Sequence, residues 1–264
     1  MKPFLSVIIP AYNEAQRLPQ TLIDVDKILT EAGYSSEVLV VSDGSKDATA
    51  EIVRRFAGHM KNVKLIDNKE NHGKGWVVRQ GMLAAKGNWR LFMDADNSTS
   101  VDQFTMMMPF FKEGYDVVFG SRGVPGAKLK PPQPWYRQIF GHIGNWIIQL
   151  VVLPGVHDSQ CGFKCFSEYA AEQIFKLARI DRWGFDVEAL ALAKMLQFKY
   201  KEIPITWVND THSTVGIKAY LQTLWDVARI AWWLKRGDYQ SHEISHESKN
   251  KKSLIENFDS RQHS

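Results

Sequence analysis

The sequence alternates short apolar runs with longer segments of helical spacing through its first 120 residues. The apolar runs cover residues 4–10, 37–43, 62–67, 89–94 and 115–120. The segments with helical spacing lie between them, at 14–32, 46–58, 73–86 and 101–113. Runs that are apolar at nearly every position indicate strands covered on both faces. This order predicts an α/β fold, with a mostly parallel sheet flanked by helices.

The pattern changes in the second half of the chain. Residues 121–138 are rich in proline and glycine, which predicts a mobile loop. Beyond it lie an amphipathic to apolar segment, two helical patterns, a strand pattern and a last helical pattern, at 139–153, 168–178, 185–197, 199–208 and about 216–236. We predict one domain over residues 1–236. The polar composition of residues 237–264 predicts a disordered tail.

Composition excludes several classes of protein. A net charge of +4 on 264 residues is too small to imply nucleic acid, although it suits phosphorylated ligands or an anionic membrane surface. Cys161 and Cys165 lack the further Cys or His partners of a zinc site, so we expect reduced thiols in a cytosolic protein. No run approaches the ~20 apolar residues of a spanning helix. The chain is therefore expected in solution or on a membrane surface.

Polar side chains follow the expected strands. In an open parallel sheet, ligands bind beyond the carboxyl ends of the strands. The residues that follow the five strands, in order, are Ala11-Tyr12-Asn13-Glu14, Ser42-Asp43-Gly44-Ser45, Asn68, Ala95-Asp96 and Ser121-Arg122. Asn13 and Asp43 could instead cap helices. Their joint placement at one edge favours a ligand site.

The segment LFMDAD ends the fourth strand with a pair of aspartates. In extended chain, side chains two residues apart point the same way, so Asp94 and Asp96 are expected to converge. Two unpaired carboxylates repel and raise a pKa, and a divalent cation relieves both effects. Oxygen ligands suit Mg²⁺ or Mn²⁺. The alternative is a plain turn with Asn97 and Ser98.

Several spaced motifs resemble a known family. SVIIPAYNE, VVSDGSKDAT, NHGKGWVVRQGMLAAKG and LFMDAD are similar to the family 2 glycosyltransferases, which have the Rossmann-like GT-A fold. VVFGSR, DSQCGFKCF, RWGFDVE and the EIPITWVND–HS stretch resemble the branch that contains the dolichyl-phosphate β-glucosyltransferases and other polyprenyl-phosphate glycosyltransferases. The resemblance covers about residues 4–235. It implies a nucleotide-sugar-binding half at 1–120 and an acceptor half at 121–236, with C-terminal acceptor-side helices.

The resemblance also implies roles for residues of the first half. The residues expected to contact the nucleotide sugar are Pro10, Ala11, Tyr12, Glu14, Asp43, Lys74 and Asp94. Lys74, in the NHGKG turn, would offset phosphate charge, unless it is a solvated surface lysine; Gly73 and Gly75 would let the backbone approach the ligand. Asp94 and Asp96 would hold Mg²⁺ or Mn²⁺.

The second half is expected to supply the acceptor contacts. The residues expected in catalysis, with Asp96, are Arg122, Asp158 and Lys164. Those expected at the acceptor or sugar are Gln160, Trp183, Asp186, Glu188, His212 and Ser213. Trp183 could equally be core, and Glu188 could pair with a basic neighbour. A lipid monophosphate is already anionic at neutral pH, with a second pKa near ~6. A sugar hydroxyl would need a base, for which Asp158 or Asp186 is the candidate.

These features predict an inverting, metal-dependent enzyme that transfers a hexose, glucose from UDP-glucose, to a polyprenyl or dolichyl phosphate. The alternatives are mannose from GDP-mannose, transfer to a sugar hydroxyl of a glycan or glycolipid, and a non-catalytic nucleotide-sugar-binding protein. The first strand is followed by PAYNEAQR, which is not the glycine-rich basic loop of nucleotidyltransferases. GxGxxG after that strand and GxxxxGK[ST] are also absent from the sequence.

Two late segments combine aromatic and basic residues. They contain Trp135, Tyr136, Phe140 and Trp146, and then Trp232, Trp233, Lys235 and Arg236. Such combinations suit a membrane interface, although both helices could instead pack as ordinary core. The printed sequence shows neither the N-terminal anchor of eukaryotic relatives nor the C-terminal spanning helices of others. We therefore expect peripheral attachment on the cytoplasmic face of a membrane.

Overall fold

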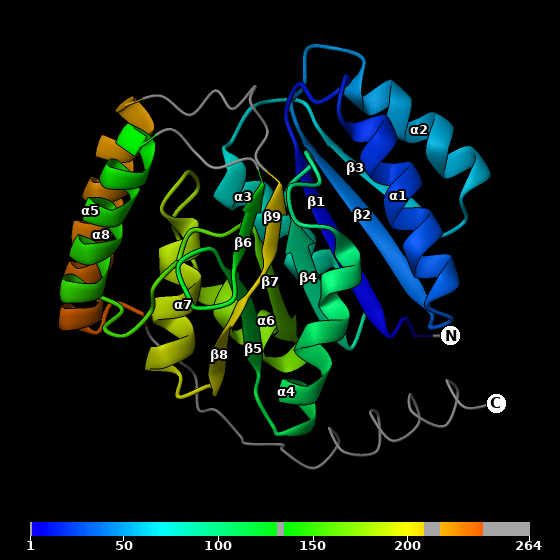
Figure 1. Cartoon of the computed structure of the whole chain (residues 1–264). Coiled ribbons are helices and arrows are strands. Elements are labelled where there is room, and N and C mark those ends of the chain that lie inside the picture. The colour runs from blue at the N-terminus through cyan, green and yellow to red at the C-terminus, as the bar shows by residue number, and fades with distance from the viewer. Residues whose placement is uncertain (1, 131–134, 209–216, 240–264) are drawn as a thin grey trace.

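The computed structural model describes residues 2–130, 135–208 and 217–239, with side chains at 2–130, 143–208 and 219–239. A seven-stranded sheet of order β3-β2-β1-β4-β7-β5-β8 forms its centre (Figure 1). Its strands are β1 (Leu5–Ala11), β2 (Ser36–Asp43), β3 (Val63–Asn68), β4 (Trp89–Met93), β5 (Val117–Ser121), β7 (Phe163–Ser167) and β8 (Tyr200–Pro204). Only β7 pairs antiparallel, with β4 and β5. The predicted α/β fold is confirmed.

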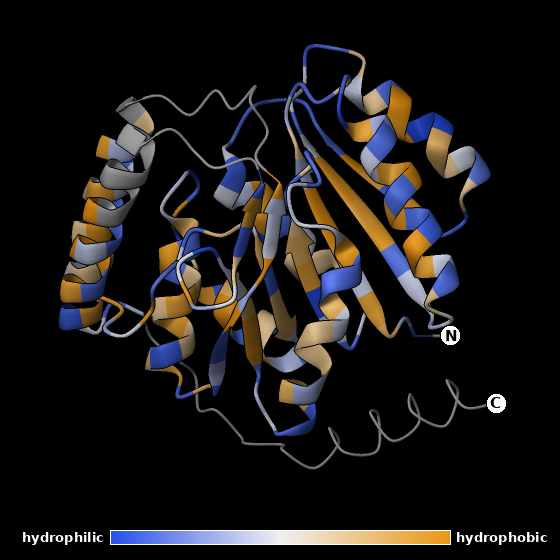
Figure 2. Cartoon of the chain, viewed as in Figure 1, coloured by the Kyte–Doolittle hydropathy of each residue, from blue (hydrophilic) through white to orange (hydrophobic). Residues whose placement is uncertain are grey.

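Helices cover both faces of this sheet. One face carries α1 (Leu18–Glu31), α2 (Thr49–His59), the 3₁₀ helix η1 (Val101–Met107) and α4 (Met108–Lys112). The other carries α3 (Lys74–Ala84), α6 (Glu168–Leu177) and α7 (Phe185–Met195). The alternation of a strand explains the two layers, because Val7 and Ile9 pack on the α1 side while Ile8 packs on the α3 side. Figure 2 shows the central strands as largely apolar.

Two helices form a separate pair at one side of the molecule. These are α5 (Trp135–Val151) and α8 (Ile217–Arg236), which pack against each other (Figure 1). Asp226 of α8 lies against Gly184 at the start of α7, so α8 also contacts the body of the fold. Among the described residues, no helix combines the length and hydropathy that crossing a bilayer requires.

The structure corrects several predicted elements. The expected loop over 121–138 contains the short strand β6 (Lys128–Lys130) and the start of α5 at Trp135. The expected strand over 199–208 divides at Ile205 into β8 and β9 (Thr206–Val208), and β9 pairs with β6 in a second, parallel sheet. The segment 101–113 is a 3₁₀ turn followed by a short helix, because Pro109 begins a new helical segment.

The ordered chain extends past the predicted domain end at 236. Tyr239 is 4% exposed, and its hydroxyl donates to Glu188 at 2.7 Å. Arg179 donates to the carbonyl of Asp238 at 2.6 Å. Residues 237–239 therefore belong to the folded domain, and the rest of the predicted tail lies outside the described residues. Cys161 and Cys165 are both buried free thiols, as expected.

A buried carboxylate joins the first strands to the turn before β4. Glu37 is 3% exposed and accepts from the Ser6 hydroxyl at 2.7 Å, the Lys86 amide at 2.7 Å and the Lys64 ammonium at 2.8 Å. Burial raises the pKa of Glu37, but these hydrogen bonds outweigh it and hold the pKa below its ordinary value of 4.5. The anionic form is therefore the one that stabilises the fold.

We expect Glu37→Gln to lower the free energy of unfolding at pH 7 by about 1.5–3 kcal/mol, because three donors lose a charged acceptor. A group with a lowered folded pKa stabilises above its unfolded pKa and loses this effect as pH falls. The difference in free energy of unfolding between the wild type and Glu37→Gln should therefore become smaller below pH 4.5. Urea unfolding between pH 7 and pH 4 measures both. Glu51→Gln, in an exposed pair with Arg55, is the control and should cost less than about 0.5 kcal/mol. If this difference in free energy of unfolding does not change with pH, the anionic form of Glu37 is not the one that stabilises the fold.

Candidate active site

The carboxyl ends of β1, β2, β4 and β5 meet at one edge of the sheet. Because β7 runs antiparallel, its first residue lies at the same edge, and Phe163 pairs with Met93 at the end of β4. This register places Gly162 beside Asp94. Residues that sequence reasoning assigned to opposite halves of the chain therefore meet at one place.

Asp94 is in contact with Lys74 and with the chain that enters β7. The Lys74 ammonium lies 2.5 Å from Asp94 Oδ1, and the two side chains are 27% and 33% exposed. A Cβ on Gly162 would lie 2.1 Å from Asp94 Oδ2. Any side chain at position 162 would force the Asp94 carboxylate to move. The sequence did not predict this contact, because the strand that follows Gly162 was itself not predicted.

Asp96 lies in a turn and not in the expected extended chain. β4 ends at Met93, the Asn97 amide donates to the Asp94 carbonyl at 3.3 Å, and Asn97 has a φ of 53°. The Ser98 amide donates to Asp96 Oδ1 at 2.9 Å. Burial, and then the charge of Asp94, raise the pKa of Asp96. The charge of Asp94 thus acts on Asp96 across a turn and not along an extended strand, and their convergence on one cation stays a prediction.

Asp43 organises the loop that leads to Lys74. It is 3% exposed and accepts from the His72 amide at 2.7 Å, the Gly73 amide at 2.9 Å and the Asn71 side chain at 2.9 Å. We expected Asp43 to bond a base or ribose directly. In the structure its carboxylate is bonded to residues 71–73, and α3 begins immediately afterwards with Lys74.

The glycines that flank Lys74 pack closely against another loop. A Cβ on Gly73 or on Gly75 would lie 2.4 Å from a carbonyl oxygen, that of Asp181 or of Ile180 respectively. Gly73 also has a φ of +110°, which disfavours any side chain. Both glycines therefore let residues 180–182 pack against the start of α3.

The first strand ends in a loop that is bonded to its neighbour. Pro10 and Ala11 are buried at the end of β1, whereas Tyr12 is 42% exposed. Glu14 forms a bidentate pair with Arg17 at 2.7 Å, and burial raises the pKa of Glu14 despite it. The Glu14 amide also donates to the Thr49 hydroxyl at 2.8 Å. The loops after β1 and β2 are therefore joined by hydrogen bonds along the same edge of the sheet.

Arg122 is held at the end of β5 by Asp158. Its Nε and Nη2 donate to the two oxygens of Asp158 at 2.7 and 3.0 Å, and its backbone amide donates to Oδ2 at 3.0 Å. Burial raises the pKa of Asp158, but Arg122 outweighs it and lowers that pKa. Glu202 accepts from the Asp158 amide at 2.7 Å, a contact that the sequence did not reveal. Asp158 is thus a strong partner for Arg122 and a weak base.

Lys164 belongs to β7, and its side chain is buried between the sheet and α7. It is fully buried, and its ammonium lies 2.5 Å from both the Cys161 carbonyl and Asp186 Oδ1. Burial raises the pKa of Asp186, and Lys164 opposes that rise. We expected Lys164 to contact a ligand as a catalytic residue. Its full burial corrects this, because the ammonium is bonded within the protein and fixes the loop before β7.

The remaining predicted residues divide into three groups. Glu188 is fully buried and accepts from the amides of Arg179 and Ile180 at 2.9 and 2.8 Å, so it holds this loop and is not an acceptor contact. Trp183 is 38% exposed and Gln160 is partly exposed, in loops beside the site. His212 and Ser213 lie outside the described residues.

Asp94 and Asp96 are the side chains suited to a divalent cation. Their oxygens are hard ligands, the pKa of Asp96 is raised, and Asp94 already holds an ammonium group. Within the described ranges, no group of three or more His, Cys, Asp or Glu side chains could hold a metal ion. Two carboxylates suit Mg²⁺, which is typically held by one or two and completed by phosphate and water.

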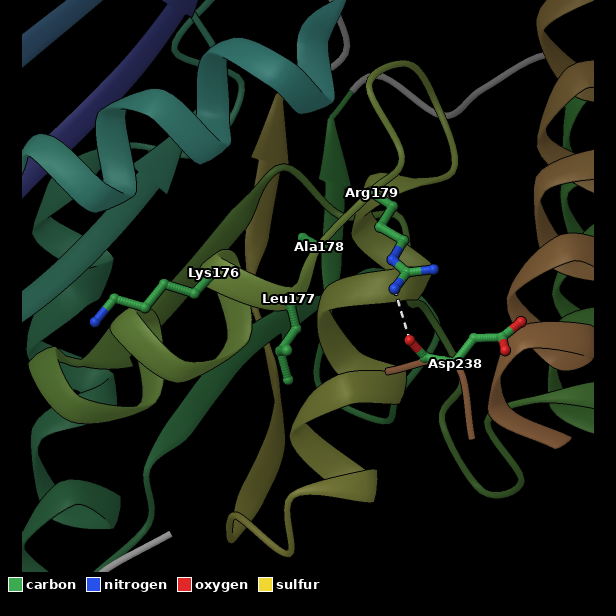
Figure 3. Close-up of a pocket in the computed structure, with 5 residues that line it drawn as sticks. All are labelled: Lys176, Leu177, Ala178, Arg179 and Asp238. Atoms are coloured by element: carbon green, nitrogen blue, oxygen red, sulfur yellow. Dashed lines mark hydrogen bonds between the residues drawn. The ribbon is translucent and has the colours of Figure 1, made fainter. Parts of the chain in front are cut away.

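A pocket lies away from this edge. It is lined by Lys176, Leu177, Ala178, Arg179 and Asp238, between the end of α6 and the chain after α8 (Figure 3). None of these residues follows a strand of the sheet. We therefore place the candidate active site at the strand ends.

Comparison with known proteins decides the family. The model of "Glycosyl transferase family 2" matches residues 6–175. The chain belongs to this family. The glycosyltransferase is 35% identical over 240 residues to dolichyl-phosphate β-glucosyltransferase of Dictyostelium discoideum, covering 86% of this chain and 73% of that protein. It is 31% identical to the Saccharomyces cerevisiae enzyme of the same name, covering 83% and 70%. The resemblance inferred from the motifs is confirmed.

Solved structures show the same fold. Glucosyl-3-phosphoglycerate synthase of Mycobacterium tuberculosis, in complex with uridine diphosphate, superposes with a TM-score of 0.64 at 15% identity, covering 87% of this chain and 80% of that one. Staphylococcus aureus TarS, in complex with UDP-GlcNAc, superposes with a TM-score of 0.55 at 17% identity, covering 99% and 72%.

We expect Gly162→Ala to lower glycosyl transfer roughly 100-fold, because its methyl group displaces the Asp94 carboxylate by about an ångström. Gly58→Ala is the matched control, since nothing lies within 4 Å of that position in α2. The control should gain about 0.5–1 kcal/mol in stability and keep wild-type turnover. Steady-state kinetics and thermal melting measure both. Wild-type turnover in Gly162→Ala would show that the contact with Asp94 has no part in the reaction.

Proposed function

We propose that this glycosyltransferase moves glucose from UDP-glucose to the phosphate of a polyprenyl or dolichyl lipid, with inversion at the anomeric carbon. The named activity of the relatives supports this acceptor and sugar. The complexes of the solved neighbours with uridine diphosphate and UDP-GlcNAc support a uridine nucleotide. The same edge of the sheet would hold donor and acceptor phosphate.

One observation favours a phosphate acceptor over a sugar hydroxyl. The two carboxylates proposed as bases are already paired, Asp158 with Arg122 and Asp186 with Lys164. A hydroxyl acceptor needs a base within hydrogen-bond reach. A lipid monophosphate does not, because its oxygen is anionic at neutral pH. The geometry therefore supports attack by a phosphate oxygen on the sugar carbon.

The donor side of the proposal rests on the β1, β2 and β4 loops. Pro10, Ala11, Tyr12 and Glu14 would line the base and ribose, and Asp43 would act by fixing the loop before Lys74. Asp94 and Asp96 would hold Mg²⁺ or Mn²⁺. The cation, when bound, stabilises the negative charge of the departing diphosphate.

The acceptor side rests on β5 and the loops around β7. Arg122 is oriented by Asp158 and would bind the acceptor phosphate with its remaining donors. Gln160 and Trp183 would contact the sugar or acceptor from neighbouring loops. His212 and Ser213 remain proposed contacts of the acceptor or sugar.

We expect Asp96→Asn to lower transfer at least about 100-fold, because charge stabilisation of the leaving group is lost. Asp102→Asn, at an exposed position on η1, is the control and should keep wild-type activity. The assay combines UDP-glucose or GDP-mannose with polyprenyl phosphate, polyprenol or a soluble glucoside, with and without Mn²⁺. The proposal is supported if the combination of UDP-glucose with polyprenyl phosphate gives product and the other combinations do not. Transfer to the glucoside would instead favour the hydroxyl acceptor, and full activity of Asp96→Asn would remove the metal pair from the mechanism.

We also propose that the α5–α8 pair attaches the enzyme to a membrane surface. On α8, Leu221, Trp225 and Trp232 are 63%, 67% and 58% exposed and follow one face of the helix. On α5, Ile143, Trp146 and Leu150 are 50%, 64% and 71% exposed. No acidic residue occurs between Asp116 and Asp158 of the sequence, and α8 ends with Lys235 and Arg236. A broad apolar stripe with basic neighbours suits an anionic bilayer. Trp233 has a different role, since it is partly buried and packs against Tyr239.

Replacing Trp225 and Trp232 together by alanine should weaken binding to phosphatidylserine-containing vesicles at least roughly tenfold, because two large apolar side chains no longer leave water. Ile23→Ala with Leu83→Ala is the control, since those side chains are exposed on α1 and α3 at 46% and 40%. Vesicle co-sedimentation measures both. Equal binding of the two double variants would contradict attachment through this face.

A further inference from the structure

Lys74 neutralises the carboxylate that the metal site needs. Its ammonium lies 2.5 Å from Asp94 Oδ1 and 6.0 Å from the centre of the Phe185 ring. The charges of Asp96 and Asp186 also act on it. Asp186 has a second cation, Lys164, at 2.5 Å. Lys74 is thus bonded to one member of the proposed metal pair, Asp94.

This contact is fixed from both sides by the fold. Asp43 bonds the loop at 71–73, which places Lys74 at the first position of α3. The absence of a side chain at Gly162 leaves space for the Asp94 carboxylate on its other side. The backbone of Lys74 is therefore held, while its ammonium stands at the end of a flexible four-carbon chain that is 27% exposed.

A divalent cation and Lys74 compete for the same oxygens. A cation bound by Asp94 and Asp96 would stand within a few ångströms of the ammonium, where the repulsion between the two charges is large. The metal must therefore displace the ammonium from Asp94 or bind weakly. A nucleotide diphosphate brings negative oxygens to the same edge and offers the displaced ammonium a new partner.

We propose that Lys74 is an internal counter-ion of the metal pair. It neutralises Asp94 in the free enzyme and moves to the donor diphosphate when a divalent cation takes Asp94. This inference rests on the proposed metal site and donor. Its consequence is positive coupling between the cation and the diphosphate, which is reciprocal by thermodynamic necessity. The free enzyme therefore avoids holding a metal without its donor.

The test is a thermodynamic cycle with Mn²⁺ and UDP as probes, measured by titration calorimetry without any turnover. In Lys74→Met, Mn²⁺ alone should bind about tenfold tighter, because the competing charge is gone. UDP alone should bind within about twofold of wild type, because Lys74 is engaged with Asp94 when no metal is present. With Mn²⁺ present, UDP should bind about tenfold more weakly. The factor by which Mn²⁺ strengthens UDP binding then falls about tenfold. The thermodynamic cycle requires that the affinity for Mn²⁺ in the presence of UDP stays close to that of the wild type.

Matched variants separate the explanations. Lys64→Met removes a lysine of β3 that pairs with Glu37 at 2.8 Å. This variant should leave the affinities for Mn²⁺ and for UDP unchanged. Lys74→Arg keeps the charge and should retain most of the coupling, which guards against a misfolded Lys74→Met. Thermal melting checks that each variant is folded.

Two results would overturn the inference. If Lys74→Met weakens UDP equally with and without Mn²⁺, Lys74 is a fixed phosphate ligand. If it leaves Mn²⁺ affinity unchanged, the ammonium does not compete with the cation. Asp96→Asn distinguishes failure of the underlying site, because unchanged Mn²⁺ binding in that variant would refute the metal pair itself.

Discussion

The antiparallel strand β7 is the constraint on which the site depends. It lies between β4 and β5 and runs against both, so the chain enters it at the edge where parallel strands end. The pairing of Met93 with Phe163 then fixes Gly162 against Asp94. A shift by one residue would turn Lys164 to the opposite face of the sheet and separate it from Asp186. Strand register therefore sets which charged groups meet.

Paired charges position the side chains of this edge. Arg122 meets Asp158, Lys164 meets Asp186, and Lys74 meets Asp94. Buried ion pairs add little net stability, yet removing one partner leaves an uncompensated charge and costs much more. Their value here is geometric. The carboxylates Asp158 and Asp186 are buried and hold the loops around β7, whereas Asp94, the partner of Lys74, is 33% exposed.

Much of the fold could be predicted from local pattern. The runs at 4–10 and 37–43 are apolar at nearly every position, and both are buried strands. β7 escaped prediction because FKCFS is short and carries Lys164 at its second position, and insertion between distant strands is not a local property. For the same reason the partners of Asp43 and Asp158, 28 to 44 residues away along the chain, could not be inferred. Asp94 and Asp96 could be proposed as a pair because two carboxylates at short spacing are visible in the sequence itself.

The anchoring of Tyr239 has a mechanical consequence. After α8 the chain returns to the body, where Tyr239 bonds Glu188, and Glu188 holds the amides of Arg179 and Ile180. The loop that continues from Ile180 packs on Gly73 and Gly75, on either side of Lys74. The helix α8 and the loop at 179–182 are thus connected through the hydrogen bonds of Tyr239 and Glu188. A displacement of α8 would therefore be transmitted through Tyr239 and Glu188 to the loop that packs beside Lys74.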